Sequence, residues 1–510
     1  MQDESISQDN SMTEQQKTLR DRGICVIIPT YNNAGTIVDV VARAQQQCSD
    51  VIVVCDGCTN STLALLQAMP TPPVIVDLKQ NKGKGTALKE GFRYALKNGF
   101  AYAITLDGDG QHFPEDIPLL LQANQKYPGA LIVGERKDLD KAERSGGSKF
   151  ANAFSNFWFA VQTGCRLKDT QTGYRLYPLK KLHGLCLLTS RYEAELELMV
   201  FASWHGVKLV SEPVNVYYPS REERVSHFRP GLDFTRISIL NTVLCILAIV
   251  YGYPLKLWRA LMTVIRTVYS FLFFFVLTDL VVLPIAVISL KLGKITEKKR
   301  QWLHRLINLF AKIVMKIHGI PGTKITIGNP HNETFEKPAV ILCNHQSHLD
   351  LMTMLVHTEK MVVLTNDWVW NSPFYGYVIR NAEFHPVSAG IDNILPDLKS
   401  LVDRGYSIAV YPEGTRSEDC HILRFHQGAF HIAQSLNLDI LPMVLYGAGK
   451  VLPKKSKFLR KGPIRIEIDQ RIAASEMLQH GESLRTQASW MRKYYQRRYT
   501  EMCNRIEQDV

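Results

Sequence analysis

Apolar runs of strand length alternate with helix-length segments along the first part of the chain. The strand-like runs are ICVIIPTY, DVIVVCDG, PVIVDL and YAITLDGDG, separated by segments such as VDVVARAQQQ and TALKEGFRYALKNG. This alternation predicts βαβ units and a parallel sheet. Ligands of such open sheets bind beyond the carboxyl ends of the strands, and Asp56 and the segment Asp107 to Asp109 fall at those ends.

A second pattern of the same kind begins after Gln301. Its strand-like runs are AVILCNH, YSIAVYPEG, ILPMVLYG and IRIEID, and a basic helix-prone tail from Ser475 to Asp509 closes the chain. The predicted fold class is therefore α/β in both halves. We expect a disordered tail over residues 1–20, a first domain over 21–235, membrane-associated helices with a basic linker over 236–300, and a second domain over 301–510.

Two long apolar segments, Ile237–Tyr253 and Thr267–Leu290, lie between the halves. A membrane-crossing helix needs about 20 apolar residues. The first segment is equally typical of a buried or interfacial helix, whereas the second is harder to place in a core, although Asp279 and Pro284 interrupt it. The segments either cross the bilayer or dip into it as a hairpin, with the basic run KLGKITEKKR at the anionic surface.

The charge and cysteine content of the chain limit the classes of molecule that it is expected to bind. The 510 residues carry 60 Lys and Arg against 48 Asp and Glu, a formal charge of +12, which suits nucleic acid, an anionic membrane or phosphorylated substrates. The basic residues are spread along the chain without a zinc-finger or RNA-binding motif, which argues against nucleic acid. The ten cysteines follow no repeated spacing, so we expect free thiols, and the pair Cys55 and Cys58 lacks the further ligands of a zinc site.

The segment TLDGDGQH places two carboxylates, Asp107 and Asp109, at the end of a predicted strand. On an extended chain these side chains point the same way and can share one divalent cation, while Gly108 and Gly110 allow a tight turn. Clustered carboxylates of this kind hold the cation that accompanies a nucleotide diphosphate. The pattern therefore predicts a nucleotide-sugar site.

The order of VIIPTYN, NKGKGTALKEG, DGDGQH and DTQTGYRLYP resembles the family 2 glycosyltransferases, particularly their dolichol-phosphate mannosyltransferase-like branch, over roughly residues 23–237. The resemblance implies a GT-A (Rossmann-like) fold and Mg²⁺ or Mn²⁺ as cofactor. It also implies that Pro29, Tyr31 and Asp56 surround the nucleotide base, that Lys84 lies near the diphosphate, and that Asp107, Asp109 and Gln111 hold the metal. On the acceptor side it implies Asp169, Arg175 and the basic segment SHFRP with His227 and Arg229.

In this chemistry the cation and Lys84 stabilise the leaving diphosphate while an acceptor oxygen attacks the anomeric carbon. A phosphate acceptor needs no strong base. For a hydroxyl acceptor we expect Asp169 to be the catalytic base, with Glu195 or Glu197 behind it. The two glutamates are equally typical of a solvated or capped helix face.

In the second half, His345 and Asp350 belong to the segment NHQSHLD. The carboxylate of Asp350, on the following helical turn, can orient the imidazole, fix its tautomer and stabilise its protonated form. His345 is then a general base for a hydroxyl, and no covalent serine nucleophile is required. His348 is a rival base, but its spacing to Asp350 is too short for the same geometry, so a structural role is preferred for it.

Together with YPEGTRS, FHQGAFHIA and LPMVLYG, this motif resembles the glycerol-phosphate and lysophospholipid acyltransferases over about residues 301–472. The resemblance implies acyl-CoA or acyl-ACP as donor and an acceptor-positioning block of Glu413, Gly414, Thr415 and Arg416, with Arg416 suited to a bidentate phosphate contact. One position departs from the family pattern, because Ala389 in FHPVSAG stands where an arginine is usual. The departure favours a glycolipid or another alcohol over glycerol phosphate as acceptor.

The two resemblances together imply a bifunctional enzyme, a metal-dependent inverting glycosyltransferase fused to an O-acyltransferase, that acts on membrane lipid acceptors. Fusion raises the local concentration of a shared lipid, which suits assembly of an acylated glycolipid, or of pigment lipids as in similar fused proteins. Both donors are cytoplasmic, so we expect the protein at the cytoplasmic face of the inner (plasma) membrane. Two crossings would put Lys256, Arg259 and Arg266 outside, against the positive-inside tendency, so a monotopic hairpin is preferred to an integral one.

Two alternatives stay open at the level of sequence. In one, polyprenyl-phosphate glycosylation and lysophospholipid acylation are separate activities of the two halves. In the other, one half is a non-catalytic membrane-docking module. Each half keeps the full set of polar residues of its motifs, which argues against the second alternative. If one half is non-catalytic, Ala389, at the position of the usual arginine, favours the C-terminal half.

Overall fold

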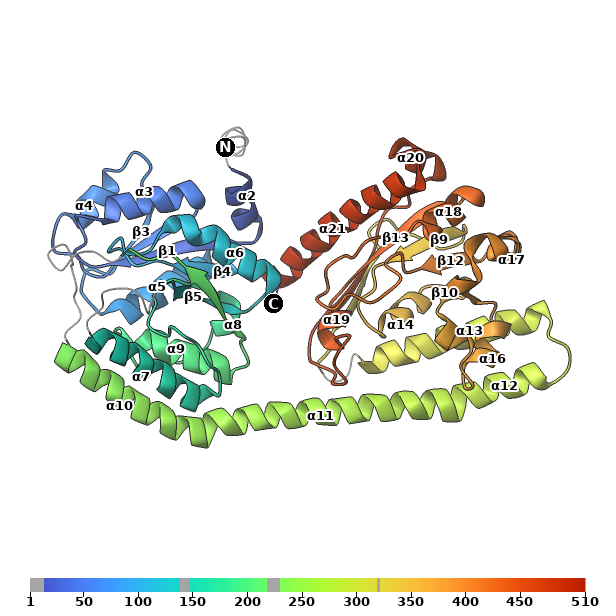
Figure 1. Ribbon diagram of the computed structural model, residues 1–510, viewed down its shortest axis with the longest axis horizontal. Coiled ribbons are helices and arrows are strands. Elements are labelled where there is room, and N and C mark those ends of the chain that lie inside the picture. Colours follow the sequence, from blue (N-terminus) through green and yellow to red (C-terminus); the bar gives the residue numbers. More distant parts are fainter. Residues whose placement is uncertain (1–12, 138–145, 218–229, 319–321, 510) are drawn as a thin grey trace. The chain divides into compact units, whose positions relative to one another are not determined.

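The computed structural model describes residues 13–137, 146–217, 230–318 and 322–509. The chain divides into two compact units, Met1–Arg259 with Asn504–Val510 and Ala260–Cys503. Each unit is built around a seven-stranded sheet covered by helices, which confirms the predicted α/β class (Figure 1). The division falls inside a long helix, so the middle segment expected over residues 236–300 is shared between the two units.

In the first unit the strand order is β3-β2-β1-β4-β6-β5-β7. Strands β1 to β4 pair in parallel, as the βαβ pattern predicts, and β5 is parallel to β7. Strand β6 runs antiparallel to both β4 and β5, and it is formed by the RLYP of DTQTGYRLYP. The strands are β1 (Ile24–Thr30), β2 (Val51–Cys55), β3 (Val74–Asp77), β4 (Tyr102–Thr105), β5 (Leu131–Arg136), β6 (Arg175–Pro178) and β7 (Leu209–Val214).

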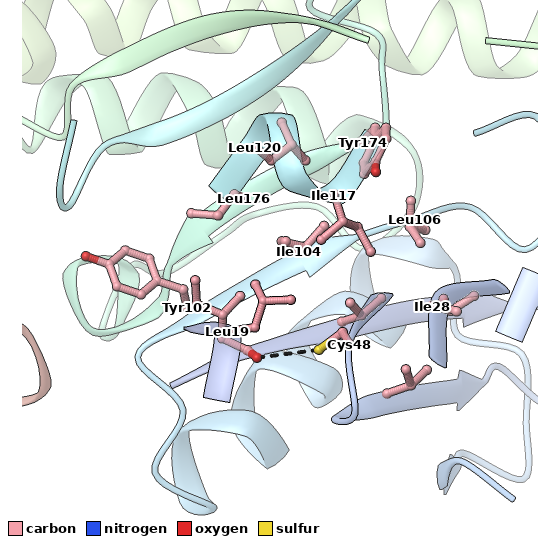
Figure 2. Packing of buried hydrophobic residues seen from close by; sticks show 14 of the residues in the cluster. Leu19, Ile28, Cys48, Tyr102, Ile104, Leu106, Ile117, Leu120, Tyr174 and Leu176 are labelled. Carbon is pink, nitrogen blue, oxygen red and sulfur yellow. Dashed lines mark hydrogen bonds between the residues drawn. The ribbon is translucent and has the colours of Figure 1, made fainter. Parts of the chain in front are cut away.

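Side chains of this sheet alternate between two buried faces. Along β1, Ile24, Val26 and Ile28 belong to one core, whereas Cys25 and Ile27 belong to the other. Figure 2 shows the first core, where Ile28 lies with side chains from β4, β6 and α6. Because both faces are covered, every residue of β1 is buried, and the strand therefore reads as one continuous apolar run. The helices are α2 (Glu14–Asp21), α3 (Ile37–Gln47), α4 (Thr62–Gln67), α5 (Lys84–Lys97), η1 (Pro114–Asp116), α6 (Ile117–Lys126), α7 (Gly146–Thr163), α8 (Leu179–Leu182), α9 (Glu193–Trp204) and α10 (Pro230–Leu247).

The first described residues form helix α2, where the sequence predicts a disordered tail to residue 20. Thr13 and Gln16 form a capping box, in which each side chain accepts a hydrogen bond from the backbone N–H of the other. Leu19 is buried in the first core, and Gln16 Nε2 donates to the carbonyl of Gln45 at 2.9 Å. The capping box and the buried Leu19 therefore stabilise a helix in a segment whose polar composition predicts disorder.

The second unit has the strand order β11-β10-β12-β9-β13-β14-β8. All neighbouring strands are parallel except β13 and β14, which are antiparallel. The strands are β8 (Ile325–Gly328), β9 (Ala339–Cys343), β10 (Met361–Thr365), β11 (His385–Pro386), β12 (Ser407–Val410), β13 (Asp439–Tyr446) and β14 (Ile464–Ile468). The pairing of β9 with β12 is decisive for the site, because it brings the residues after these two strands to the same edge of the sheet.

Helices cover this second sheet. On the last of them, α21, the hydroxyl of Tyr495 donates to Leu342 O at 2.7 Å and accepts from Met443 N at 3.2 Å, which ties the helix to β9 and β13. The helices are α13 (Glu297–His318), α14 (Asp350–Leu355), α15 (Asp367–Trp370), α16 (Gly376–Asn381), η4 (Val387–Ala389), α17 (Ile391–Asp403), α18 (Gly428–Ser435), α19 (Ala448–Val451), α20 (Ala474–Gln479) and α21 (Leu484–Asp509).

The middle of the chain is one long helix, where the sequence predicts two helices joined by a turn. It continues from α10 through η2 (Ala248–Gly252), α11 (Tyr253–Phe275), η3 (Val276–Val282) and α12 (Leu283–Lys291). Both η2 and η3 are π-helical, and Pro254 and Pro284 are the second residues after them. Local π-helical turns accommodate the missing proline N–H, so the helix continues and the chain turns only after Lys291.

Among the described helices, Thr235–Lys291 is the one that is long and apolar enough to cross a membrane. Two of the basic residues that a two-crossing arrangement would put outside the membrane contact helix ends of the first unit. Lys256 donates to the carbonyl of Thr163 at the end of α7, and Arg259 donates to the carbonyl of Trp204 at the end of α9. Cations are favourable at helix C-termini, so these residues dock the helix onto its own domain and give no information on membrane topology.

Candidate active sites

The first polar cluster lies where β4 ends, next to the start of α5. Lys84 Nζ lies 2.6 Å from Asp107 Oδ1 and 2.8 Å from Glu195 Oε2. Gly173 packs against the same cluster, since a Cβ at this position would lie only 2.6 Å from Asp107 Oδ2. The structure therefore brings Lys84 and Asp107 together and adds Gly173, whose one signal in the sequence is its place within DTQTGYRLYP.

The charges of Asp107 and Asp109 are only partly balanced by the neighbouring Lys84. Burial, and then the charge of Asp107, raise the pKa of Asp109 to about 6. Burial also disfavours the charged form of Asp107, yet the adjacent ammonium of Lys84 keeps the pKa of Asp107 below its usual value. Burial lowers the pKa of the neighbouring His112 to about 4, so this imidazole is neutral near pH 7 and supplies no charge. An added cation would relieve the repulsion between the two carboxylates.

The oxygen donors here fit a hard divalent cation. Gln111 is held beside the carboxylates because its backbone N donates to Asp109 Oδ1 at 3.0 Å. No group of three or more His, Cys, Asp or Glu residues suited to a metal occurs within the described part of the chain. Mg²⁺ typically takes one or two protein carboxylates and completes its coordination with water and substrate phosphates. The pair therefore suits a cation that is bound together with a diphosphate.

Two residues expected on the acceptor side, Asp169 and Arg175, form hydrogen bonds to other residues of the same domain. Arg136 binds the buried Asp169 with Nε at 2.5 Å and Nη2 at 2.8 Å. Arg175 lies within β6, where it donates to the Tyr177 hydroxyl at 3.1 Å and to two backbone carbonyls at 2.9 Å. A carboxylate in a bidentate ion pair is a poor base, and a guanidinium bonded to carbonyls is not open to a substrate. The geometry thus opposes the expected roles of Asp169 and Arg175.

Asp56 and Glu197 hold loops in place. Asp56 accepts from Lys82 N and Gly83 N, both at 2.8 Å, and so shapes the chain that leads into α5 and Lys84. Glu197, expected as a reserve base, is fully buried and accepts a hydrogen bond from the backbone before α9.

The other residues predicted for this site lie near the end of β1 or outside the described residues. Pro29 is buried in β1, and Tyr31 is half-buried just beyond it. His227 and Arg229 lie outside the described residues.

The second polar cluster lies at the carboxyl ends of β9 and β12. His345 Nδ1 is 2.8 Å from Asp350 Oδ2, and the imidazole stacks on the ring of Tyr411 with 4.0 Å between centroids. The same Asp350 oxygen accepts from Gln346 N at 2.6 Å and from Ser347 N at 2.8 Å. Because Asp350 is fully buried and held by these bonds, it fixes the orientation of the imidazole and leaves Nε2 as the ring nitrogen that does not contact Asp350.

Glu413, which the sequence assigns to acceptor positioning, instead supports His345. Its side chain is buried, and its two oxygens accept from His345 N at 2.8 Å and from Leu423 N at 2.7 Å. Burial raises the pKa of Glu413 to about 7, against the effect of these two hydrogen bonds. Ser417 N donates to His345 O at 2.8 Å, so the backbone of the histidine is held on both sides by the YPEGTRS segment.

The remaining residues of that segment are accessible. Gly414 has a φ of +64°, in the left-handed region that favours glycine. Gly414 and Thr415 are exposed and Arg416 is half-buried, so this part of the block, unlike Glu413, is open to an acceptor. His348 is exposed as well, so burial gives no support to the structural role expected for it.

Two family models match the chain, one in each half. The model described as Glycosyl transferase family 2 matches residues 25–171, and the model described as Acyltransferase matches residues 324–446. The chain therefore combines a family 2 glycosyltransferase domain with an acyltransferase domain, as the two sets of motifs predict. Both are families of enzymes.

Curated relatives follow the same division. The 1-acyl-sn-glycerol-3-phosphate acyltransferase of the Arabidopsis thaliana chloroplast is 29% identical over 185 residues, which are 35% of this chain and 51% of the relative. The UDP-N-acetylglucosamine–dolichyl-phosphate N-acetylglucosaminyltransferase of Methanococcus voltae is 27% identical over 220 residues, which are 39% of this chain and 88% of the relative. This chain spans about half the length of the acyltransferase relatives that it matches. Among solved structures, the 1-acyl-sn-glycerophosphate acyltransferase of Thermotoga maritima has a TM-score of 0.41 and 20% identity, over 48% of this chain and 97% of that one.

Proposed function

We propose that this protein is a bifunctional transferase that moves a sugar from a nucleotide-sugar, and an acyl group from acyl-CoA or acyl-ACP, to membrane lipid acceptors. The observation that carries the proposal is the pair His345 and Asp350, which has the geometry of an oriented general base at the end of a central strand. The carboxylates Asp107 and Asp109 support the sugar-transfer half in the same way. Both clusters lie beyond the carboxyl ends of strands, where ligands of α/β sheets bind.

In the acyl transfer, His345 Nε2 accepts the proton of the acceptor hydroxyl while the hydroxyl oxygen attacks the thioester carbonyl. The C–S bond then breaks, and the imidazolium returns its proton to the departing thiolate. Asp350 keeps the proton of the neutral imidazole on Nδ1 and stabilises the imidazolium. Glu413 holds the backbone of His345, and Arg416, with Gly414 and Thr415, is the proposed contact of the acceptor.

In the sugar transfer, a Mg²⁺ or Mn²⁺ ion held by Asp107, Asp109 and Gln111 would neutralise charge on the leaving diphosphate. Lys84 positions Asp107 through their ion pair and adds positive charge at the same edge of the sheet. Because Asp169 is held by Arg136, an acceptor that needs no base, such as a phosphate, suits this site better than a hydroxyl.

The long helix Thr235–Lys291 is the proposed membrane attachment. Large apolar side chains are exposed along it, among them Ile249, Leu257 and Leu272. Exposed apolar surface of this extent is typical of a helix that lies in or on a bilayer. Since nucleotide-sugars and acyl thioesters are cytoplasmic, we place both domains at the cytoplasmic face of the plasma membrane.

An assay with both donors tests the proposal. Purified protein is incubated with a nucleotide-sugar, Mn²⁺, acyl-CoA and a lipid extract, and the lipids are followed by mass spectrometry. We expect a lipid that gains both a sugar and an acyl chain, and we expect EDTA to abolish sugar transfer and therefore the doubly modified lipid. Turnover of neither donor would reject the proposal.

The activities named for the two relatives favour a second candidate, in which the two halves make separate products. By these names the Methanococcus protein acts on dolichyl phosphate and the Arabidopsis protein on 1-acyl-glycerol 3-phosphate. Asp169 is held by Arg136 and is therefore a poor base, which agrees with a polyprenyl-phosphate acceptor because a phosphate needs no base. Variants Asp109→Asn and His345→Ala distinguish the two candidates, because one shared product disappears in both variants whereas separate products each disappear in one.

A further inference from the structure

A positively charged cavity lies in the second unit, outside the residues assigned to catalysis. It has a volume of about 210 Å³ and is lined by Arg424, Arg485 and Arg492, so we call it the arginine cavity. The first arginine belongs to the segment after YPEGTRS, and the other two belong to α21. The remaining lining residues are Phe425, Gln427, Ala488 and Ser489, and none of them is acidic.

The three guanidinium groups are not neutralised by the fold. Among the described residues, none of the three forms an ion pair or a hydrogen bond, and Arg492 Nε is buried without a partner. Arg498 on the same helix behaves differently, because it pairs with Asp469 at 2.6 Å. Like charges around one cavity repel each other, and a bound anion would relieve this repulsion.

The arginine cavity adjoins the acyl-transfer site. Leu423 N donates to Glu413 at 2.7 Å, and Arg424 is the next residue along the chain. Glu413 in turn bonds the backbone of His345 at 2.8 Å. Burial raises the pKa of Glu413, and the charge of Arg492 acts against this shift, as expected for a guanidinium close to that carboxyl. One buried carboxylate therefore lies between the catalytic histidine and the cavity.

A helix terminus adds to the positive charge. Helix α18 begins at Gly428, its N-cap residue Gln427 lines the cavity, and the Gln427 side chain makes no capping hydrogen bond. Backbone N–H groups at a helix N-terminus attract anions, so this end of α18 reinforces the field of the three arginines.

We infer that the arginine cavity binds a phosphate group of an acyl-transfer substrate. Arginine makes bidentate, charge-assisted hydrogen bonds to phosphate, and three guanidinium groups around one cavity suit a phosphate ester or a diphosphate. Two substrate classes of the proposed acyl transfer carry such groups: acyl-CoA has a diphosphate and a 3′-phosphate, and a glycerol-phosphate acceptor has a phosphate monoester. The identity of the ligand rests on the proposed function, whereas the anion site rests on the cavity itself.

Calorimetric titration of the full-length protein tests the inference with CoA, sn-glycerol 3-phosphate and inorganic pyrophosphate as probes. The double variant Arg424→Gln/Arg485→Gln removes two exposed guanidinium groups and leaves Arg492 beside Glu413. We expect at least about tenfold weaker binding of CoA or of glycerol 3-phosphate, because each charge-assisted contact is worth about that factor. Lys493→Gln, which removes an exposed charge of the same helix outside the cavity, serves as the matched control and should bind as the wild type does.

The probes separate the two sources of phosphate. Loss of CoA binding assigns the arginine cavity to the acyl donor, and loss of glycerol 3-phosphate binding assigns it to the acceptor. Binding of pyrophosphate alone, no binding to the wild type, or equal loss in Lys493→Gln would overturn the inference. The titration needs no turnover, so a protein that is inactive in acyl transfer but loses CoA binding in the double variant would keep the cavity assignment and reject the activity.

Discussion

The two candidate sites differ in how their charges are balanced. At the C-terminal site, Asp350 and Glu413 hold His345 through hydrogen bonds of 2.8 Å. At the N-terminal site, Lys84 is shared between Asp107 and Glu195, and Asp109 is left with a pKa raised to about 6. The comparison teaches that the His345 cluster is organised by the protein alone, whereas the Asp107 and Asp109 cluster has the charge balance of a site that an added cation would complete.

Removing the base of the self-contained site should have the largest effect. We expect His345→Ala to lower acyl transfer by roughly 10²- to 10⁴-fold, the usual contribution of a general base, and to leave sugar transfer unchanged. The rate of CoA release measures the first activity, and release of nucleoside diphosphate measures the second. His348→Ala, in an exposed histidine of the same segment, is the control. An equal loss in that control would show that His345 is not the base.

Removing one carboxylate of the cation-dependent site should have the reciprocal effect. We expect Asp109→Asn to weaken Mn²⁺ binding and to lower sugar transfer by about a hundredfold or more, because a group that stabilises charge in the transition state is lost. Acyl transfer should not change. Asp39→Asn, an exposed acidic residue on α3, provides the control. Unaltered Mn²⁺ affinity in Asp109→Asn would separate this carboxylate from the metal.

The largely buried ion pairs of Lys84 offer a test by stability. Replacing Lys84 by Met leaves Asp107 and Glu195 uncompensated, so we expect a loss of about 3–5 kcal/mol in the free energy of unfolding of the N-terminal domain. Lys168→Met, which removes an exposed lysine that pairs with the half-buried Glu135, should cost less than about 1 kcal/mol. Thermal unfolding with and without Mn²⁺ measures both. If the bound cation supplies the missing charge, it recovers part of the Lys84→Met loss, and a variant as stable as the wild type would contradict this balance.

The raised pKa of Asp109 makes cation binding depend on pH. Mn²⁺ binds the ionised carboxylate, so its affinity should rise as the pH rises through about 6 and be roughly tenfold weaker at pH 5 than at pH 7. Without metal the sign for stability is opposite: the folded state holds this proton more tightly than the unfolded state, so stability falls as the pH rises from about 4 to 6. Metal titrations of wild type and Asp109→Asn at several pH values check this, and a pH-dependent step that persists in the variant would assign it to another group.

The strand pattern and the motifs were enough to predict much of this molecule. Alternating apolar runs predict the parallel strands of both sheets, since a strand buried on both faces, such as β1, must be continuously apolar. The spacing of His345 and Asp350 predicts their contact, because the residues lie on adjoining turns of one short segment. Features of this kind are predictable because they depend on the repeat of side-chain directions within a single strand or helix.

Long-range partners were not predictable in the same way. Arg136 and Asp169 are far apart in sequence, and nothing local announces that one neutralises the other. Likewise Arg175 reads as a site residue until pairing places β6 between β4 and β5. The continuity of the long helix depends on π-helical turns before Pro254 and Pro284, which apolar periodicity does not reveal. These features follow from tertiary packing and not from local sequence.

Two independent transferase sites in one chain are tested most directly by comparing Asp109→Asn and His345→Ala side by side. Each purified variant receives both donors, Mn²⁺, a lipid extract and the lipid product of the step that it lacks, and release of nucleoside diphosphate and of CoA is followed. We predict that Asp109→Asn releases only CoA and that His345→Ala releases only nucleoside diphosphate. Loss of both releases in either variant would contradict the independence of the two sites.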